Sequence, residues 1–360
     1  MAAAASAPRP EPESPAGARL STAALRAALA VGRGTDALAH AAAAIRDQVR
    51  DDFRVTGDVL TTTGLYARIN DLVTEQLVCA GAAEMGLDLG RACWLAFGSQ
   101  GRSEQTPATD QDNGWVLCGS AAASERARWL ELGQRVNAAL AVCGYTLCKG
   151  QVMAGQPGCC LTVGEWCGRF DAWIEHGAPE DLLAASIYFD LRGLVGRVDL
   201  AAAMRQRLTT RAAAVPRFLK QLADNALRHA VPMDWLGRVR PLRRNGCAVF
   251  DLKLSGTAIF VETARLYALA HGIAGTGTVE RLDAVARALR VPAQESEAWR
   301  VGFVGLQCLR LRAHAGGDWP ADNPNLIGLD ALVPADRQIL KQGLRAARLL
   351  QQRAELDYWR

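Results

Sequence analysis

Apolar residues recur at three- and four-residue spacing near the start of the chain and again through its second half. From residue 21 to 87 this spacing predicts helices, the first opening with a Ser21-Thr22 cap signal. After residue 178 the same spacing runs almost to the C-terminus and predicts helices throughout, the segment 180–196 included. We therefore expect an N-terminal helical segment over 21–87 and a C-terminal helical bundle over 179–360.

The pattern changes between residues 88 and 178. Two compact apolar runs, "ACWLAFG" and "NGWVLCG", are typical of buried strands, and the residues between them allow a turn and a short helix. A long amphipathic pattern then predicts a helix over 124–145, "TLCKGQVMA" a third strand, and residues 162–177 another helix. This order predicts a small α/β domain over 88–178, and an α+β protein overall.

Composition and net charge limit the kinds of protein that this chain can be. The chain has 360 residues, 50% of them hydrophobic and 22% charged, which is typical of a soluble globular protein with two or three packed units. A formal net charge of +4 does not indicate nucleic acid as a partner, but it suits a protein that handles anionic phosphates.

The first residues of the chain and the lengths of its apolar runs indicate where in the cell the protein is expected. Residues 1–20 are rich in Ala, Pro and Ser and lack the apolar core of a signal peptide, so they predict a disordered tail. No apolar run is long enough to cross a bilayer. We expect a cytoplasmic protein with no membrane partner.

Ten cysteines lie scattered among apolar residues. None forms a C-x-x-C pair; Cys159 and Cys160 are adjacent, and Cys143 and Cys148 flank a turn. The five histidines form no H-x-x-x-H pair. These spacings favour reduced, mostly buried thiols over a disulfide framework or a zinc site.

The stretch "GSQGRSEQTPATDQDN" carries the candidate chemistry. Asp110 and Asp112 are two residues apart at the start of a predicted strand, so their carboxylates face the same side and favour a divalent cation between them. Gly98 and Ser99 end the preceding strand, where a glycine lets backbone N–H groups approach a phosphate. Arg102 can pair with phosphate oxygens. The combination predicts a site for metal-assisted phosphoryl or nucleotidyl transfer.

A simpler interpretation is an ordinary polar loop, because D-x-D and Gly-Ser are each common in turns. The order of strand, Gly-Ser, polar segment and D-x-D leading into a second strand is more specific. Other phosphate-binding motifs are absent from the sequence: it has no G-x-x-x-x-G-K-[ST], and "HGIAGTGT" does not fit G-x-G-x-x-G.

Gly98-Ser99 followed by Asp110-x-Asp112 resembles the signature of the polymerase-beta-type nucleotidyltransferase superfamily. The stretch is similar to the first domain of PII-protein uridylyltransferase. It is more similar still to bacterial signal-transduction proteins that carry this domain beside CBS or cyclic-nucleotide-binding domains. Segments such as "CGYTLCKGQVMA", "FDLKLSGTAIFVETARLYAL" and "DNPNLIGLDAL" extend the resemblance over about residues 45–350.

The resemblance implies a small mixed sheet flanked by helices, and a C-terminal region that covers the nucleotide or the acceptor. It implies a nucleoside triphosphate held by Gly98, Ser99, Gly101 and Arg102, with Mg²⁺ (or Mn²⁺) on Asp110 and Asp112 as metal ligands and catalytic groups. Glu104 accompanies Arg102, either acting directly or only orienting it.

Related enzymes place a third carboxylate on a later strand, but "TLCKGQVMA" contains no acid. Glu165, Asp171 and Asp190 are the nearest alternatives, and for Asp190 a structural ion pair with Arg192 is favoured over catalysis. Three cations remain as candidates for phosphate binding: Lys149, Lys253 and Arg265. Each is equally compatible with a purely structural or solvent-exposed role.

Two functions follow as expectations. The first is a uridylyltransferase-like enzyme in signal transduction that transfers a nucleoside monophosphate to a hydroxyl of a protein or a small molecule. The second is a nucleotide-binding regulatory module with weak or no activity, favoured by the missing third carboxylate. In either case a nucleotide is the expected ligand; the acceptor is a protein or a small molecule, and the chain is either free-standing or works with a separate sensory partner. Besides these two functions, a helical scaffold with a vestigial α/β unit is the weakest expectation.

Overall fold

The computed structural model describes residues 21–358, apart from 31–33, 120–121, 179–180, 183–184, 229, 317–319 and 321. The predicted tail at 1–20 lies outside the described residues. Three helices open the described chain: α1 (Thr22–Leu29), α2 (Thr35–Thr56) and α3 (Val59–Glu84). The side chain of Ser21 accepts a hydrogen bond from the backbone N–H of Ala24, which confirms the predicted cap of α1.

A four-stranded sheet follows, in the order β3-β2-β1-β4. Strands β1 (Ala92–Ala96) and β2 (Asn113–Leu117) are the two predicted strands, and they pair antiparallel. Strand β4 (Arg192–Gly196) is antiparallel to β1, whereas β3 (Cys160–Thr162) is parallel to β2. The sheet is therefore small and mixed, as the resemblance implied.

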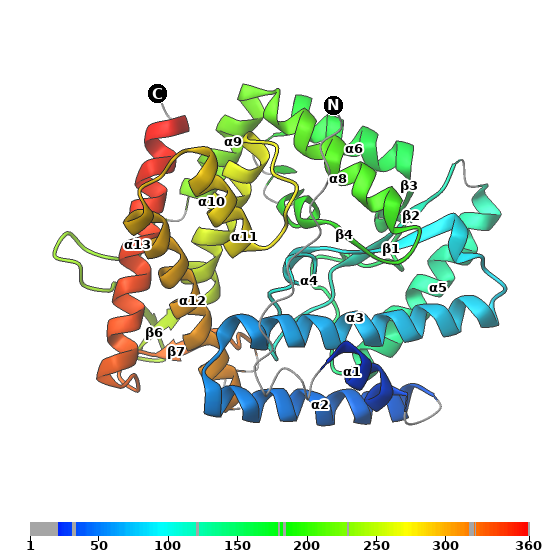
Figure 1. Ribbon diagram of the computed structural model, residues 1–360, viewed down its shortest axis with the longest axis horizontal. Coiled ribbons are helices and arrows are strands. Elements are labelled where there is room, and N and C mark those ends of the chain that lie inside the picture. Colours follow the sequence, from blue (N-terminus) through cyan, green and yellow to red (C-terminus); the bar gives the residue numbers. More distant parts are fainter. Residues whose placement is uncertain are drawn as a thin grey trace.

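Helices cover both faces of this sheet (Figure 1). Helices α6 (Val163–His176) and α8 (Val198–Ala213) pack on one face, and α3 and α5 (Ala123–Val142) on the other. Because strand side chains alternate, Cys93 and Leu95 enter the core under α6 and α8, while Trp94 enters the core against α3 and α5. Both central strands are buried along their whole length.

Two sequence-based predictions in this domain are wrong. The segment "TLCKGQVMA" is not a strand of the sheet; it forms an isolated bridge at Thr146 with Asp110, and the third strand is Cys160–Thr162. Residues 180–196 are not one helix: the 3₁₀ turn η4 (Ser186–Asp190) precedes β4. Strand β4 thus lies beyond residue 178, within the segment assigned to the helical domain.

The C-terminal region contains the predicted helices α9 (Pro216–Leu227), α10 (Ala258–Ala270), α11 (Thr278–Ala288), α12 (Ala293–Gly316) and α13 (Pro334–Tyr358). It also contains a second sheet that the helical pattern did not predict, with β6 (Cys247–Asp251) between β5 (Leu242–Arg244) and β7 (Leu326–Gly328). A π-helical turn, η5 (Lys253–Thr257), leads from β6 into α10. No helix among the described residues is long and apolar enough to span a membrane.

Candidate functional site

The two ends of the stretch that carries the candidate chemistry meet at one edge of the sheet. Ala96 at the end of β1 pairs with Asn113 at the start of β2, so the residues just beyond them are neighbours. The backbone N–H of Phe97 donates a hydrogen bond to the carbonyl oxygen of Asp112 at 2.9 Å. Gly98 begins the short helix α4 (Gly98–Gly101) immediately after this contact. Antiparallel pairing therefore brings Gly98 and Asp112 together.

Alternation along residues 110–113 separates two roles. Asp110 and Asp112 line a cavity of about 270 Å³. Gln111 and Asn113 point the other way and bind Asn137 of α5, whose side-chain NH₂ donates to Gln111 Oε1 at 2.8 Å and to Asn113 Oδ1 at 2.9 Å. The segment that carries the two aspartates is therefore fixed by hydrogen bonds among buried amide side chains on its opposite side.

The carboxylate of Asp112 lies in an unfavourable environment for its own charge. The residue is 5% exposed, and its Oδ1 accepts no hydrogen bond among the described residues. Burial first, and then the charge of Asp110, raise the pKa of Asp112 to about 7. Two adjacent carboxylates, one of them buried with an unpartnered oxygen, form a donor set that fits a divalent cation.

A residue dismissed at the sequence level completes this cluster. One ligand atom each from Asp110, Asp112 and Cys148 lie within 4.8 Å of one another. The backbone N–H of Gln111 donates to the carbonyl oxygen of Thr146 at 2.8 Å, which holds the segment before Cys148 alongside Asp110. Spacing motifs could not find Cys148, because its partners are more than thirty residues away in sequence.

The three acids proposed as a third carboxylate have other partners. Glu165 forms a capping box with Thr162 at the start of α6. Asp171 pairs with Arg207 at 2.6 Å. Asp190 is fully buried and accepts from Arg102, Arg265 and Arg281. Among the described residues, no acid other than Asp110 and Asp112 joins this candidate metal cluster.

Two glycines allow the close packing of this site. Gly98 has φ +51°, and a Cβ there would lie 2.6 Å from Asp112 Oδ2. A Cβ on Gly101 would lie 2.0 Å from the carbonyl oxygen of Asp190. Ser99 is partly exposed, and its hydroxyl lies 3.3 Å from that of Thr109. Gly98 and Ser99 line the cavity, whereas Gly101 supports it from the side of η4.

Arg102 and Glu104 connect the site to the C-terminal region. Arg102 donates to Glu104 at 3.0 Å and to Asp190 at 2.6 Å. Glu104 in turn accepts from the backbone N–H and the hydroxyl of Thr278, at the first turn of α11. These contacts favour the orienting role of Glu104. The predicted ion pair of Asp190 with Arg192 is wrong, because Arg192 binds Asp71 of α3 at 3.0 Å.

Asp190 is the centre of a buried ionic cluster between the two regions. Burial alone would raise its pKa, but Arg265, Arg281 and Arg102 hold the pKa well below its usual range. Arg265 contributes two bonds, at 3.0 and 2.6 Å, and Arg281 one at 2.7 Å. Glu104, which binds Arg102, and Glu262, which binds Arg265, bring the carboxylates to three, so the three guanidinium groups of the cluster are balanced.

The C-terminal region supplies one wall of the cavity. Lys253 and Arg265 line it, as does Arg310 of α12, which the sequence analysis did not single out. Arg310 donates to two neutral oxygens, Gln307 Oε1 at 2.6 Å and Asn325 Oδ1 at 3.1 Å, and burial lowers its pKa to about 10. Lys149 is exposed and is not among the lining residues.

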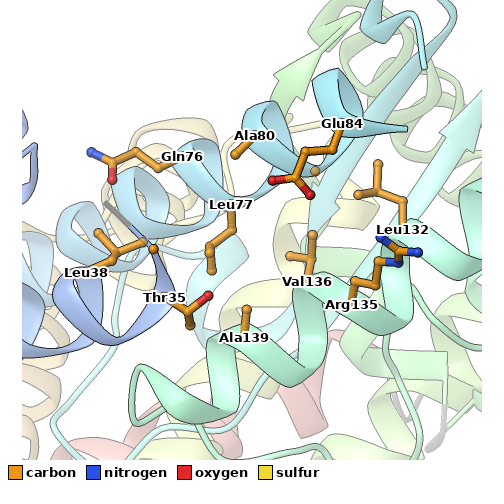
Figure 2. Close-up of a pocket in the computed structure, with 12 residues that line it drawn as sticks. Thr35, Leu38, Gln76, Leu77, Ala80, Glu84, Leu132, Arg135, Val136 and Ala139 are labelled. Atoms are coloured by element: carbon orange, nitrogen blue, oxygen red, sulfur yellow. The ribbon is translucent and has the colours of Figure 1, made fainter. Parts of the chain in front are cut away.

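A second cavity, of about 370 Å³, lies among α2, α3 and α5 (Figure 2). Its lining is mainly apolar, with Leu38, Leu77 and Val136 in its interior and the polar side chains of Glu84 and Arg135 beside them. It shares no lining residue with the cavity that contains the aspartates. We assign no chemistry to it.

Comparison with known families gives two matches. Residues 43–180 match the family described as "Putative nucleotidyltransferase DUF294", and residues 216–358 match its companion, "Putative nucleotidyltransferase substrate binding domain". No curated protein matches the chain. The first match contains Gly98, Asp110, Asp112 and Cys148, and the second contains Lys253, Arg265 and Arg310. The cavity is therefore lined by residues from both matched domains, and the chain belongs to the DUF294 nucleotidyltransferase family.

Proposed function

We propose that this protein transfers a nucleoside monophosphate from a nucleoside triphosphate to an acceptor hydroxyl, with Asp110 and Asp112 as the ligands of a divalent cation. One observation carries the proposal. The two carboxylates and the side chain of Ser99 line one cavity. Four cationic side chains line the same cavity: Arg102, Lys253, Arg265 and Arg310. Carboxylates for a metal beside cations for phosphates is the arrangement that nucleotidyl transfer requires.

The residues have separate tasks in the proposed reaction. When bound, a cation such as Mg²⁺ or Mn²⁺ would neutralise triphosphate charge and lower the pKa of the acceptor hydroxyl. Gly98 leaves room for Asp112, and Ser99 offers a hydroxyl to the phosphates. The acceptor oxygen bonds to the α-phosphorus as the bond to the pyrophosphate oxygen breaks. Pyrophosphate leaves with that electron pair, and the hydroxyl proton passes to solvent.

Arg310 and Lys253 are our candidates for holding the β- and γ-phosphates from the C-terminal side. Arg310 is buried, with only 8% of its surface exposed. Even so, it has no ion-pair partner among the described residues. A buried guanidinium bonded only to amide oxygens gains from an arriving anion. We expect Arg310→Gln to weaken triphosphate binding by about 10- to 100-fold, the equivalent of a charge-assisted hydrogen bond. Lys149, exposed one residue after Cys148, stays a weaker candidate.

The nucleotide and the acceptor follow from the resemblance alone. The "GSQGRSEQ…TDQDN" stretch favours a uridylyltransferase-like reaction on a protein hydroxyl, in signal transduction, with a separate sensory protein as partner. A cytoplasmic location fits the ten cysteines, all of which are free thiols.

The test is label transfer. Purified protein is incubated with α-labelled UTP or ATP, Mg²⁺ or Mn²⁺, and candidate acceptors, and pyrophosphate release is followed in parallel. We expect transfer by the wild type and its loss when Asp110→Asn and Asp112→Asn are combined. Tight nucleotide binding without transfer to any acceptor, and without pyrophosphate release, would count against an enzyme.

That outcome would support the second candidate, a nucleotide-binding regulatory module. The observation in its favour is that no third carboxylate joins the cluster among the described residues. Nucleotide binding would then act on the interface where Glu104, which accepts from Arg102, contacts α11. Calorimetry of metal-dependent nucleotide binding, compared with pyrophosphate release in the same samples, separates the two functions.

A further inference from the structure

Asp110, Asp112 and Cys148 are close enough to hold one ion. Their ligand atoms lie within 4.8 Å of one another. A sulfur and an oxygen on opposite sides of one divalent ion are separated by roughly 4.4 Å, the sum of typical metal–sulfur and metal–oxygen distances. The 4.8 Å limit exceeds this separation by only a few tenths of an ångström, so small side-chain movements bring all three residues to the same ion.

A second observation independently points to a ligand at this place. Asp112 is 5% exposed, lines the cavity, and leaves Oδ1 without a hydrogen-bond partner among the described residues. An ionised carboxylate oxygen in such a position is stable only with a cation beside it. Because Cys148 is the third member of this cluster, the cation that satisfies Asp112 comes within reach of the thiol.

Burial and the negative charge of Asp112 raise the pKa of the Cys148 thiol to about 11, so the sulfur of the metal-free protein is protonated. The backbone N–H groups of Gly150 and Val152 both donate to it. The turn that aims them is held in place: Gln151 has φ +58°, and its N–H donates to the carbonyl oxygen of Cys148 at 3.1 Å. A divalent cation between Asp112 and the sulfur would offset the carboxylate charge, and a thiol that coordinates a metal loses its proton.

We propose that Cys148 is a thiolate ligand of the divalent cation held by Asp110 and Asp112, and that the site therefore binds thiophilic ions such as Co²⁺ and Zn²⁺ more tightly than Mg²⁺. On binding, the S–H bond breaks, a sulfur–metal bond forms, and the proton passes to solvent. Mg²⁺ takes oxygen ligands, whereas thiolates select softer ions. The inference rests on the metal site of the proposed function but does not require transfer activity.

Cobalt reports the ligand directly. Co²⁺ is titrated into the full-length, nucleotide-free protein while near-ultraviolet absorption is recorded, because a cobalt–thiolate bond gives a charge-transfer band that carboxylates do not give. We expect the band in the wild type and its loss in Cys148→Ser, with Co²⁺ affinity at least roughly tenfold weaker. Cys148→Asp, an all-oxygen site, should lack the band and bind Mg²⁺ more tightly than the wild type.

Two controls locate the band. Cys159→Ser changes a buried thiol outside the cluster, whose sulfur lies 3.7 Å from the Tyr188 hydroxyl, and should leave the band intact. Asp110→Asn with Asp112→Asn should abolish it. The inference is overturned if Co²⁺ binds the wild type without the band, or if the band survives Cys148→Ser. If the band appears but no label is transferred, the result contradicts the proposed enzyme activity and still supports Cys148 as a thiolate ligand.

Discussion

Gly98 illustrates how one residue can set the geometry of the site. Alanine there would adopt φ +51° and place its Cβ 2.6 Å from Asp112 Oδ2. We expect Gly98→Ala to lower the free energy of unfolding by about 1–2 kcal/mol from the left-handed backbone, and also to weaken Co²⁺ or Mn²⁺ binding at least roughly tenfold by displacing the carboxylate. Urea unfolding and calorimetric titration measure the two effects.

Gly57 provides the matched control. It has φ +66° at the end of α2, and a Cβ there would meet nothing within 4 Å. Gly57→Ala should therefore show the backbone cost with unchanged metal affinity. Equal metal binding by both variants would contradict the role assigned to the contact between Gly98 and Asp112.

Asp112 gives a prediction about stability and pH in the metal-free protein. Burial and Asp110 raise its pKa from 3.8 to about 7. Between these values the folded protein retains a proton that the unfolded chain has released, so the free energy of unfolding falls as pH rises through this window. Asn does not titrate. With a chelator present, Asp112→Asn should be more stable than the wild type at pH 8, by up to roughly 4 kcal/mol, and the difference should vanish near pH 4.

Urea unfolding of both proteins at several pH values between 4 and 8 tests this sign. Adding Mn²⁺ at pH 8 should restore stability to the wild type and do little for the variant, because only the wild type has the full carboxylate pair. A wild type as stable at pH 8 as at pH 5 without metal would show that Asp112 is not destabilised in the folded state.

At the scale of elements, α5 holds the segment that carries Cys148. Asn137 donates to Gln111 and Asn113 and accepts from the backbone N–H of Gly155 at 3.0 Å. Asn137→Ala would remove the partner of Gln111 Oε1 and of the Gly155 N–H, while Asn113 Oδ1 would keep the N–H of Ala154. We expect a loss of about 2–4 kcal/mol in the free energy of unfolding, and a weaker cobalt–thiolate band, because the loop at 145–155 is no longer fixed.

Gln134 is one turn earlier on α5 and makes only a long contact, 3.4 Å, to the carbonyl oxygen of Gly155. Gln134→Ala should cost less than about 1 kcal/mol and leave the band unchanged. If Asn137→Ala behaves like Gln134→Ala, the buried amides do not position the loop.

The elements also show what the sequence could and could not predict. Strands β1 and β2, the short helix between them and the facing aspartates follow from local patterns of apolar and polar residues. Strand β4 did not, because its short apolar segment follows a 3₁₀ turn and fits a helical pattern as well as a strand. Cys148 and Arg310 could not be predicted either, because the residues that give each of them a role are distant in the sequence.

At the scale of the molecule, buried ion pairs connect the two matched domains. Asp190, at the end of η4 beside β4, binds Arg102 from the nucleotidyltransferase domain and Arg265 and Arg281 from the substrate-binding domain. The hydroxyl of Thr276 adds a bond to the carbonyl oxygen of Gly101 at 2.8 Å. Arg102 and Arg265 also line the cavity, so the contact between the domains and the proposed binding of phosphate depend on one cluster.

Asp190→Asn tests that dependence, because it keeps the shape of the side chain and removes the charge. Three buried guanidinium groups would lose their shared carboxylate, and we expect about 3–5 kcal/mol less stability. Asp171→Asn is the control: Asp171 binds Arg207 and Arg211 at a partly exposed position, where the loss should stay within about 1 kcal/mol. Since Asp110, Asp112 and Cys148 all lie in the first domain, Co²⁺ binding by Asp190→Asn should survive while nucleotide affinity falls. Equal loss of both would mean that the ionic cluster also shapes the metal site.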